Sequence, residues 1–342
     1  MKEIGKMVTT AMFDENSPFN VWADKWFLYK SVGISDGYKS AISSQVRYLS
    51  DYFGDTPVNE IRPMQICDMI NELALENPNT KRPSSKQLLK DIRCVASSIF
   101  SYVSANTGYD NNPAKVATIP KDAPKNTRRA LTEEEIGWLI SFDHKARLPA
   151  LIMCFCGLRA GEMIPLLWSD IDFANGEIQV TKSVSRKTGG YKVKQGTKNG
   201  KKRKVRVPKS LLNELQTYRD NADSRYVCPK ADGDMHTVSS WRRMWDSYHT
   251  QLSHQYATVK QSKQNLYSPK GVKVKIEKIT PHMLRHTFAT LLYTSGVDVL
   301  TASKLLGHSN ISITLEIYTH LEEEKYIISI ENYEVYIEER FF

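Results

Sequence analysis

The chain has 342 residues, of which 41% are hydrophobic and 25% are charged, and its formal net charge is +9 at pH 7. This is the composition of an ordinary globular protein long enough for two domains, and its basic balance suits a polyanionic partner such as DNA. The sequence has neither a signal-peptide h-region nor an apolar run of about 18 residues, which excludes a membrane-spanning protein and predicts a cytoplasmic one.

Helical periodicity governs residues 18–110 and predicts four helices packed as a small bundle. Ser17 followed by Pro18 predicts the first helix start, with serine as the cap and proline in the first turn. Pro63 opens the third helix in the same way. We therefore expect a short extension over residues 1–17 and a helical domain over residues 18–110.

Residues 111–129 differ in composition from the segments on either side. They contain Pro120 and Pro124, and four basic residues lie between Lys121 and Arg129. Because proline fixes φ and removes a hydrogen-bond donor, this composition predicts an extended linker between domains. The basic residues suit a segment that crosses a phosphate backbone, and they suit a solvated linker equally well.

The remaining residues predict a second, mixed domain over 130–342. Thr132 and Glu135 have the spacing of a capping box, and helical segments follow them. Residues 177–209 alternate polar and apolar in the manner of short antiparallel strands. Residues 239–252 predict another amphipathic helix, and residues 255–275 a basic, polar loop. The fold class predicted for the whole chain is therefore α+β and mostly helical, with one small antiparallel sheet.

A run of like charge overlaps the predicted strands. Between Ile178 and Asn213 there are twelve lysines and arginines and no acidic residue. Solvated surfaces usually mix the two signs of charge, so this run predicts contact with nucleic acid. The DNA-contacting residues that we expect within it are Lys201, Lys202, Arg203, Lys204 and Arg206.

Five short motifs carry side chains suited to phosphoryl chemistry. In chain order they are CGLRAGE (156–162), TKNGKKRK (197–204), TPHMLRHTF (280–288), LLGHSN (305–310) and EIYTH (316–320). A helix that starts at Thr280 puts His282 and Arg285 on one face. A glycine helix end at 307 leaves His308 in a turn, and a short helix would then carry Tyr318.

Each of these residue types has a role in attack on a phosphodiester. Arg159 and Arg285 would neutralise the non-bridging oxygens, because a guanidinium stays charged and donates two parallel hydrogen bonds. Tyr318 would be the nucleophile, with His282 as its proton acceptor and His308 donating to the phosphate. Lys198 would protonate the leaving 5′-oxygen, and other lysines of the same segment compete for that role.

The order Arg, Lys, His-x-x-Arg, His, Tyr resembles that of the tyrosine recombinases, the phage-integrase family. The resemblance implies a helical, SAM-like core-binding domain before a catalytic domain, with Glu162 supporting Arg159. It implies a site-specific recombinase or integrase that cuts and rejoins duplex DNA through a 3′-phosphotyrosine and a Holliday junction, for a phage or other mobile element.

The resemblance also implies partners and a metal-free mechanism. A homotetramer would assemble on two recombination sites, and an excisionase or directionality factor could accompany it. No Walker loop, paired carboxylates or zinc-ligand set is present, so we expect neither a metal nor a cofactor. The residues before 18 are too few for the arm-binding domain of many phage integrases.

Two alternatives remain beside the recombinase. A type IB topoisomerase would use the same chemistry to relax supercoils, and a non-catalytic DNA-binding regulator would keep the fold alone. The tail over residues 321–342 is acidic, and residues 326–337 alternate like short strands. Such a tail would either pack on its own catalytic domain or reach a neighbouring protomer.

Overall fold

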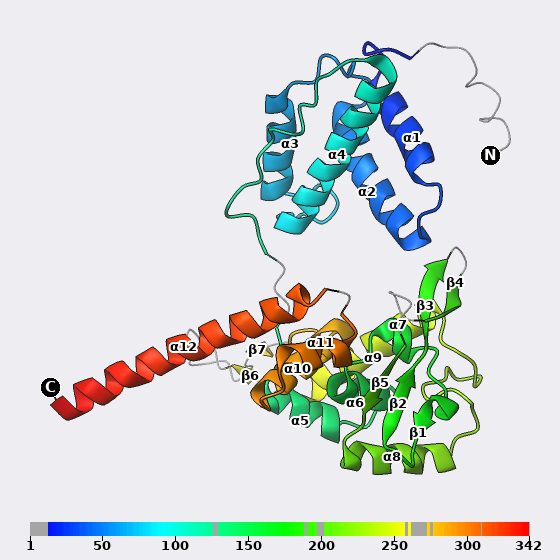
Figure 1. Ribbon diagram of the computed structural model, residues 1–342, viewed down its shortest axis with the longest axis vertical. Coiled ribbons are helices and arrows are strands. Elements are labelled where there is room, and N and C mark those ends of the chain that lie inside the picture. Colours follow the sequence, from blue (N-terminus) through cyan, green and yellow to red (C-terminus); the bar gives the residue numbers. More distant parts are fainter. Residues whose placement is uncertain are drawn as a thin grey trace. The chain divides into compact units, whose positions relative to one another are not determined.

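The computed structural model describes residues 13–125, 129–187, 190–196, 202–256, 259–260, 272–273, 276–308 and 310–341. The chain divides into two compact units, Met1–Thr127 and Arg128–Phe342. The predicted class is confirmed, since the fold is mostly helical with small antiparallel sheets (Figure 1). No helix among the described residues is long and apolar enough to cross a membrane.

The first unit contains the four predicted helices. They are α1 (Phe19–Lys30), α2 (Asp36–Phe53), α3 (Pro63–Leu75) and α4 (Lys86–Thr107). Pro63 occupies the first turn of α3 as expected. The predicted cap at Ser17 is wrong, because Pro18 itself precedes the helix and the Ser17 hydroxyl bonds to Asp14.

Aromatic rings fill the centre of this bundle. Phe19, from the first turn of α1, packs against Phe53 and Phe100 with ring centroids 5.4 and 5.9 Å apart. Trp26 is also buried, and its indole nitrogen donates to the Ser98 hydroxyl at 3.0 Å, so its polar atom is satisfied. The apolar residues that recur at helical spacing in the sequence therefore form the core faces of these helices.

The segment expected to be an extended linker packs on the bundle over most of its described length. Ala114, Ala117 and Ala123 are buried in the core of the first unit. Arg93 of α4 donates to the Ala117 carbonyl at 2.9 Å, and the Lys86 amide donates to the Pro124 carbonyl at 2.8 Å. The small side chains of these alanines let the chain lie close to α4, a packing that the prolines and charges of the segment did not indicate.

The second unit is built on eight helices among the described residues. They are α5 (Glu133–Ser141), α6 (Arg147–Cys156), α7 (Ala160–Met163), α8 (Lys209–Asp220), α9 (Val238–Tyr256), α10 (Pro281–Thr294), α11 (Val299–Leu306) and α12 (Ser312–Phe341). The capping box of Thr132 and Glu135 is confirmed at the start of α5. Helix α6 is almost wholly buried and packs against α10, which makes these two helices the centre of the unit.

Antiparallel strands flank these helices, and four of them lie within residues 177–209, where the alternating pattern predicted strands. A three-stranded sheet has the order β1–β2–β5, and two hairpins pair β3 with β4 and β6 with β7. The strands are β1 (Ile171–Asp172), β2 (Glu177–Val180), β3 (Lys182–Lys187), β4 (Gly190–Gln195), β5 (Arg203–Arg206), β6 (Val259–Lys260) and β7 (Val272–Lys273). Ile178 of β2 pairs with Val205 of β5, and both side chains are buried. Most of the expected loop at 255–275 lies outside the described residues, but its described parts are not loop: they form the end of α9 and the paired strands β6 and β7.

The strand prediction for the tail is wrong. Residues 326–337 belong to α12, which runs as one helix from Ser312 to Phe341 (Figure 1). Tyr326, Ile330, Tyr333 and Ile337 recur at helical spacing as well as within the alternation, so the pattern fits both structures. Extending an existing helix needs no new nucleation, and the many glutamates favour it.

Candidate active site

Helix α10 carries the HMLR part of the longest motif. The Thr280 side chain caps the helix by accepting from the Met283 amide at 3.3 Å, and a proline occupies the first turn. Arg285 is therefore placed one turn into the helix, where it is buried. It donates to the Gly157 carbonyl at 2.6 Å and to the Leu306 carbonyl. His282, three residues earlier, is exposed.

Arg159 lies at the start of α7, just after the turn that ends α6. Gly157 adopts φ +65° there, and a Cβ at this position would lie 2.2 Å from the Phe288 ring. The predicted contact with Glu162 is present, since Arg159 Nη1 donates to Oε1 at 2.9 Å. The Arg159 amide donates to the other carboxylate oxygen at 2.9 Å. Its Nη2 donates to the Gly307 carbonyl at 3.0 Å.

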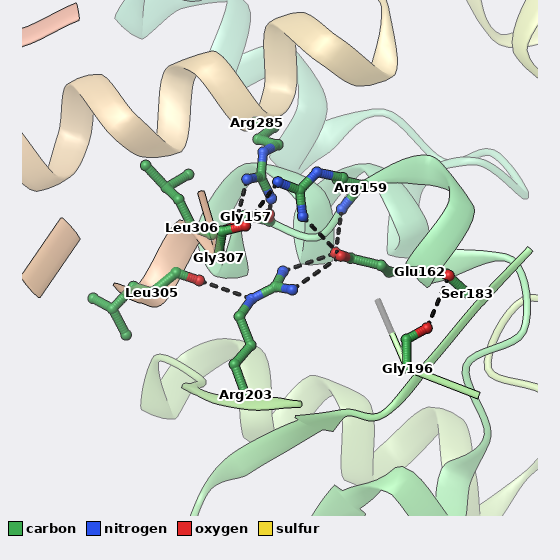
Figure 2. A network of polar contacts seen from close by, with 10 residues as sticks. All are labelled: Gly157, Arg159, Glu162, Ser183, Gly196, Arg203, Arg285, Leu305, Leu306 and Gly307. Atoms are coloured by element: carbon green, nitrogen blue, oxygen red, sulfur yellow. Dashed lines mark hydrogen bonds and ion pairs between the residues drawn. The ribbon is translucent and has the colours of Figure 1, made fainter. Parts of the chain in front are cut away.

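A third arginine joins these two, although the basic run of the sequence predicted a DNA contact for it. Arg203, at the start of β5, donates Nη1 and Nη2 to the two Glu162 oxygens at 2.9 and 2.8 Å. Its Nε donates to the Leu305 carbonyl at 2.9 Å. Figure 2 shows Arg159 and Arg203 converging on Glu162, with Arg285 beside them. The expected DNA contact of Arg203 stays a prediction, but its guanidinium is directed into the protein.

The end of α11 holds all three arginines. The carbonyls of residues 305, 306 and 307 accept from Arg203, Arg285 and Arg159 in turn (Figure 2). The last carbonyls of a helix lack partners within the helix and carry its partial negative charge, so cations there are stabilised. Gly307 ends this helix with φ +64°, as predicted. Hydrogen bonds therefore join the three arginines to the turn that carries His308.

His308 follows this turn and is half-buried. Its Nδ1 lies 2.7 Å from the hydroxyl oxygen of Thr314, a fully buried residue of α12. Burial and the positive charges of Arg285, Arg159 and Arg203 lower the pKa of His308 to about 4. The imidazole is therefore neutral at neutral pH. If the Thr314 hydroxyl donates to Nδ1, the proton of the ring sits on Nε2, which can donate to a ligand.

Charge in the cluster is unbalanced toward positive. The pKa of Glu162 is lowered, because hydrogen bonds and charge from Arg203 and Arg159 outweigh the effect of its burial. Burial and repulsion from Arg159 and Arg203 lower the pKa of Arg285 to about 9, which leaves it charged at neutral pH. Three guanidiniums thus face one carboxylate, and the excess suits an anionic ligand.

Tyr318 lies on the next helix, with its ring almost buried. Its hydroxyl donates to the Val297 carbonyl at 3.0 Å, and its ring meets that of Tyr293 edge-on at 5.1 Å. Burial and the charge of Asp298 raise the pKa of its phenol. Among the described residues, no hydrogen bond joins this hydroxyl to the three arginines. The phenol therefore lies in the same unit as the arginines, but it is neutral and donates its proton to a backbone carbonyl.

The remaining expected residues fall into two groups. Lys198 and Lys201 lie outside the described residues. Lys202, Lys204 and Arg206 are exposed, and Lys204 pairs with Glu177 at 3.3 Å. They alternate along the chain with Arg203, Val205 and Val207, so they point away from the core of the sheet.

Sequence reasoning missed two members of the cluster. Arg203 lies two residues before Val205 and therefore on the same, inward face of β5, which is a signal that the crowding of lysines obscured. Thr314 gave no signal of its own, because a threonine on a helix usually bonds to a carbonyl of the preceding turn.

The fold and the cluster together define a class of protein. A helical unit precedes a mixed unit in which three arginines and a neutral histidine gather at the end of α11, while a tyrosine lies on the following helix; these are the groups that an enzyme acting on a phosphodiester requires. The model of the phage integrase family matches residues 129–325. The chain belongs to this family and is a tyrosine recombinase, a DNA strand-transferring enzyme.

Individual relatives agree with this assignment. Tyrosine recombinase XerA of Thermococcus onnurineus is 30% identical over 241 residues, which are 69% of this chain and 72% of that protein. Tyrosine recombinase XerD of Proteus mirabilis is 25% identical over 334 residues, covering 94% and 95%.

Solved structures share the fold at lower identity. The Tn1549 transposon integrase in complex with transposon right end DNA has a TM-score of 0.70 and 20% identity, covering 90% of this chain and 99% of that one. A lambda integrase tetramer bound to a Holliday junction has a TM-score of 0.61 and 19% identity, covering 89% and 78%.

Proposed function

We propose that this protein is a site-specific recombinase of a phage or other mobile element. It would cut and rejoin two DNA duplexes, one strand pair at a time, through a Holliday junction. The observation that carries the proposal is the arginine cluster at the end of α11, because it joins Arg159 and Arg285 to the turn of His308. Structural neighbours in complex with transposon end DNA and with a Holliday junction support it.

In the proposed reaction the phenolic oxygen of Tyr318 attacks the scissile phosphorus. A bond forms between this oxygen and phosphorus while the bond from phosphorus to the 5′-oxygen breaks. The phenolic proton passes to His282, and Lys198 gives a proton to the leaving oxygen. One phosphodiester is exchanged for one phosphotyrosine, so rejoining is the reverse reaction and needs neither ATP nor metal.

The arginine clamp would act on the non-bridging oxygens. Arg159 and Arg285 now donate to backbone carbonyls, and a phosphate carries more negative charge than a carbonyl. A bound phosphate would therefore compete for these donors, and His308 would add a neutral N–H donor. Tyr318 must leave its bond to Val297 to reach the phosphorus, so we propose that DNA binding and assembly release it.

Assembly would use the acidic tail. Residues 321–342 contain seven acids and two bases, which suits a basic neighbouring protomer better than DNA. We propose that the end of α12 docks on such a protomer in a homotetramer. Deleting residues 326–342 should leave DNA binding intact and lower synapsis, whereas normal recombination by the deleted protein would refute this role.

The test needs a substrate for this chain. A duplex selected from a random-sequence library by binding to the full chain, here called the selected duplex, would be nicked near the cleaved phosphate to trap the adduct. We expect the wild-type protein to form a covalent complex and Tyr318→Phe to bind without forming one. Arg159→Ala and Arg285→Ala should cleave at least ~10²-fold more slowly, with binding much less affected. Near-normal cleavage by either arginine variant would refute its assignment.

Two further experiments test the finer points. A sulfur in place of the 5′-oxygen needs no proton on leaving, so it should rescue Lys198→Ala but not Lys204→Ala. A supercoiled plasmid without the selected duplex separates the alternative activities. Rapid relaxation would favour a topoisomerase, and the absence of any adduct on either DNA would favour a regulator that only binds.

A further inference from the structure

We infer that Arg203 is a positioning residue for the catalytic arginine Arg159 and for the turn that carries His308. The inference rests on the proposed function. It differs from the DNA contact that the basic run suggested, because it assigns the guanidinium to the inside of the site.

The first observation is that every nitrogen of the Arg203 guanidinium donates to a group within the protein. Both Nη atoms bind Glu162 and Nε binds the Leu305 carbonyl, so each of its three nitrogens has a partner. Only 8% of its side chain is exposed, and the Glu162 side chain is 1% exposed. A planar guanidinium with two parallel bonds to a carboxylate fixes the orientation of that carboxylate.

The second observation is that Glu162 is shared. Its Oε1 atom accepts from Nη1 of Arg159 and from Nη1 of Arg203, each at 2.9 Å. Arg203 therefore fixes the orientation of the Glu162 carboxylate, and this carboxylate in turn orients the Arg159 guanidinium. Without Arg203, the carboxylate would be free to turn fully toward Arg159 or to take up a proton.

The third observation concerns the turn itself. A Cβ placed on Gly307 would lie 3.1 Å from Cδ and 3.2 Å from Nη1 of Arg203, so this side chain packs directly on the glycine. The same glycine offers its carbonyl to Arg159 and precedes His308. Arg203 thus contacts the turn by one hydrogen bond and by packing, and it connects strand β5 to Arg159 and to the turn of His308, two of the three groups proposed to bind the phosphate.

The test compares Arg203→Met with Arg147→Met. Arg147 is a matched control in the same unit, since it donates Nε to the Ile140 carbonyl at 2.7 Å and its Nη atoms to the Glu214 carboxylate, away from the cluster. On the nicked selected duplex, Arg203→Met should cleave on the order of 10²-fold more slowly, the loss expected for a small misplacement of reacting groups. Binding should change by less than about threefold, and Arg203→Lys should recover part of the rate.

A pH profile separates positioning from general structural damage. Charged groups around Glu162 are Arg159, Arg203 and Arg285, while His308 is neutral. Removing Arg203 leaves burial less opposed, so the pKa of Glu162 should rise. A raised pKa means that part of the Glu162 carboxyl is protonated at lower pH and cannot hold Arg159 as a carboxylate. The cleavage rate of Arg203→Met, relative to that of the wild type, should therefore increase with pH. This trend should vanish when Glu162→Gln is added.

The possible outcomes distinguish the inference from the proposed function. Slow cleavage by Arg203→Met with the pH trend, and normal cleavage by Arg147→Met, would support it. Equal rates for the two variants would overturn the positioning role while the proposed function stands, as would a loss of binding equal to the loss of cleavage. A wild-type protein that formed no adduct would overturn the proposed function and this inference together.

Discussion

Replacing Glu162 with glutamine removes the carboxylate on which the arginine cluster converges. The side chain is 1% exposed and accepts from Arg159 and from both Nη atoms of Arg203. Breaking a buried ion pair by removing one partner leaves an uncompensated charge and costs about 3–5 kcal/mol. We expect Glu162→Gln to lower the free energy of unfolding of the second unit by that amount.

The measurement is urea unfolding followed by pulsed hydrogen exchange, with peptides from residues 129–187 reporting on this unit. Glu177→Gln is the control, because Glu177 pairs with a lysine whose side chain is 64% exposed, and such surface pairs contribute about 0–1 kcal/mol. The pKa of Glu162 is lowered below its ordinary value of 4.5. The stability that the ionised Glu162 contributes is therefore fully present above pH 4.5, and it is lost as pH falls through the lowered pKa of the folded protein. A loss no larger than that of the control would refute the reasoning.

Three other perturbations test neighbouring parts of the site. Gly157→Ala should destabilise the unit in thermal unfolding by more than Gly296→Ala does. Both glycines have positive φ, but only a Cβ at residue 157 meets Phe288, so equal losses would contradict the packing described. Thr314→Val should slow cleavage of the selected duplex by about tenfold, the contribution of one hydrogen bond, whereas Thr314→Ser should not. Equal rates for the two variants would show that the threonine hydroxyl does not support His308. The imidazole of His308 should titrate near pH 4 by NMR, and a midpoint above its ordinary 6.5 would show that burial and the arginines do not dominate its environment.

Local signals in the sequence predicted most of the helices and strands. Caps and glycine ends depend on a few adjacent residues, so Thr132, Thr280 and Gly307 could be assigned correctly without tertiary information. The tail could not, because its apolar residues satisfy two periodicities at once. The prolines and charges of residues 111–129 are visible in the sequence and predicted an extended linker, whereas the contacts of the described part with α4 are tertiary and leave no local signal.

The candidate site was predictable as a set of residues but not as a network. The motifs identified Arg159, Glu162, Arg285 and His308, and the structure joins them at the end of α11. Which carbonyl accepts from which arginine depends on packing between segments more than a hundred residues apart. The inward direction of Arg203 and the bond between Tyr318 and Val297 are tertiary facts of the same kind.

The central claim is that Tyr318 becomes covalently joined to DNA. The most direct measurement is mass spectrometry of the peptide that carries the nucleotide, after wild-type protein is trapped on the nicked selected duplex and digested. The account predicts the adduct on the phenolic oxygen of Tyr318. An adduct on another residue, such as Tyr326 further along α12, or no adduct at all, would contradict it.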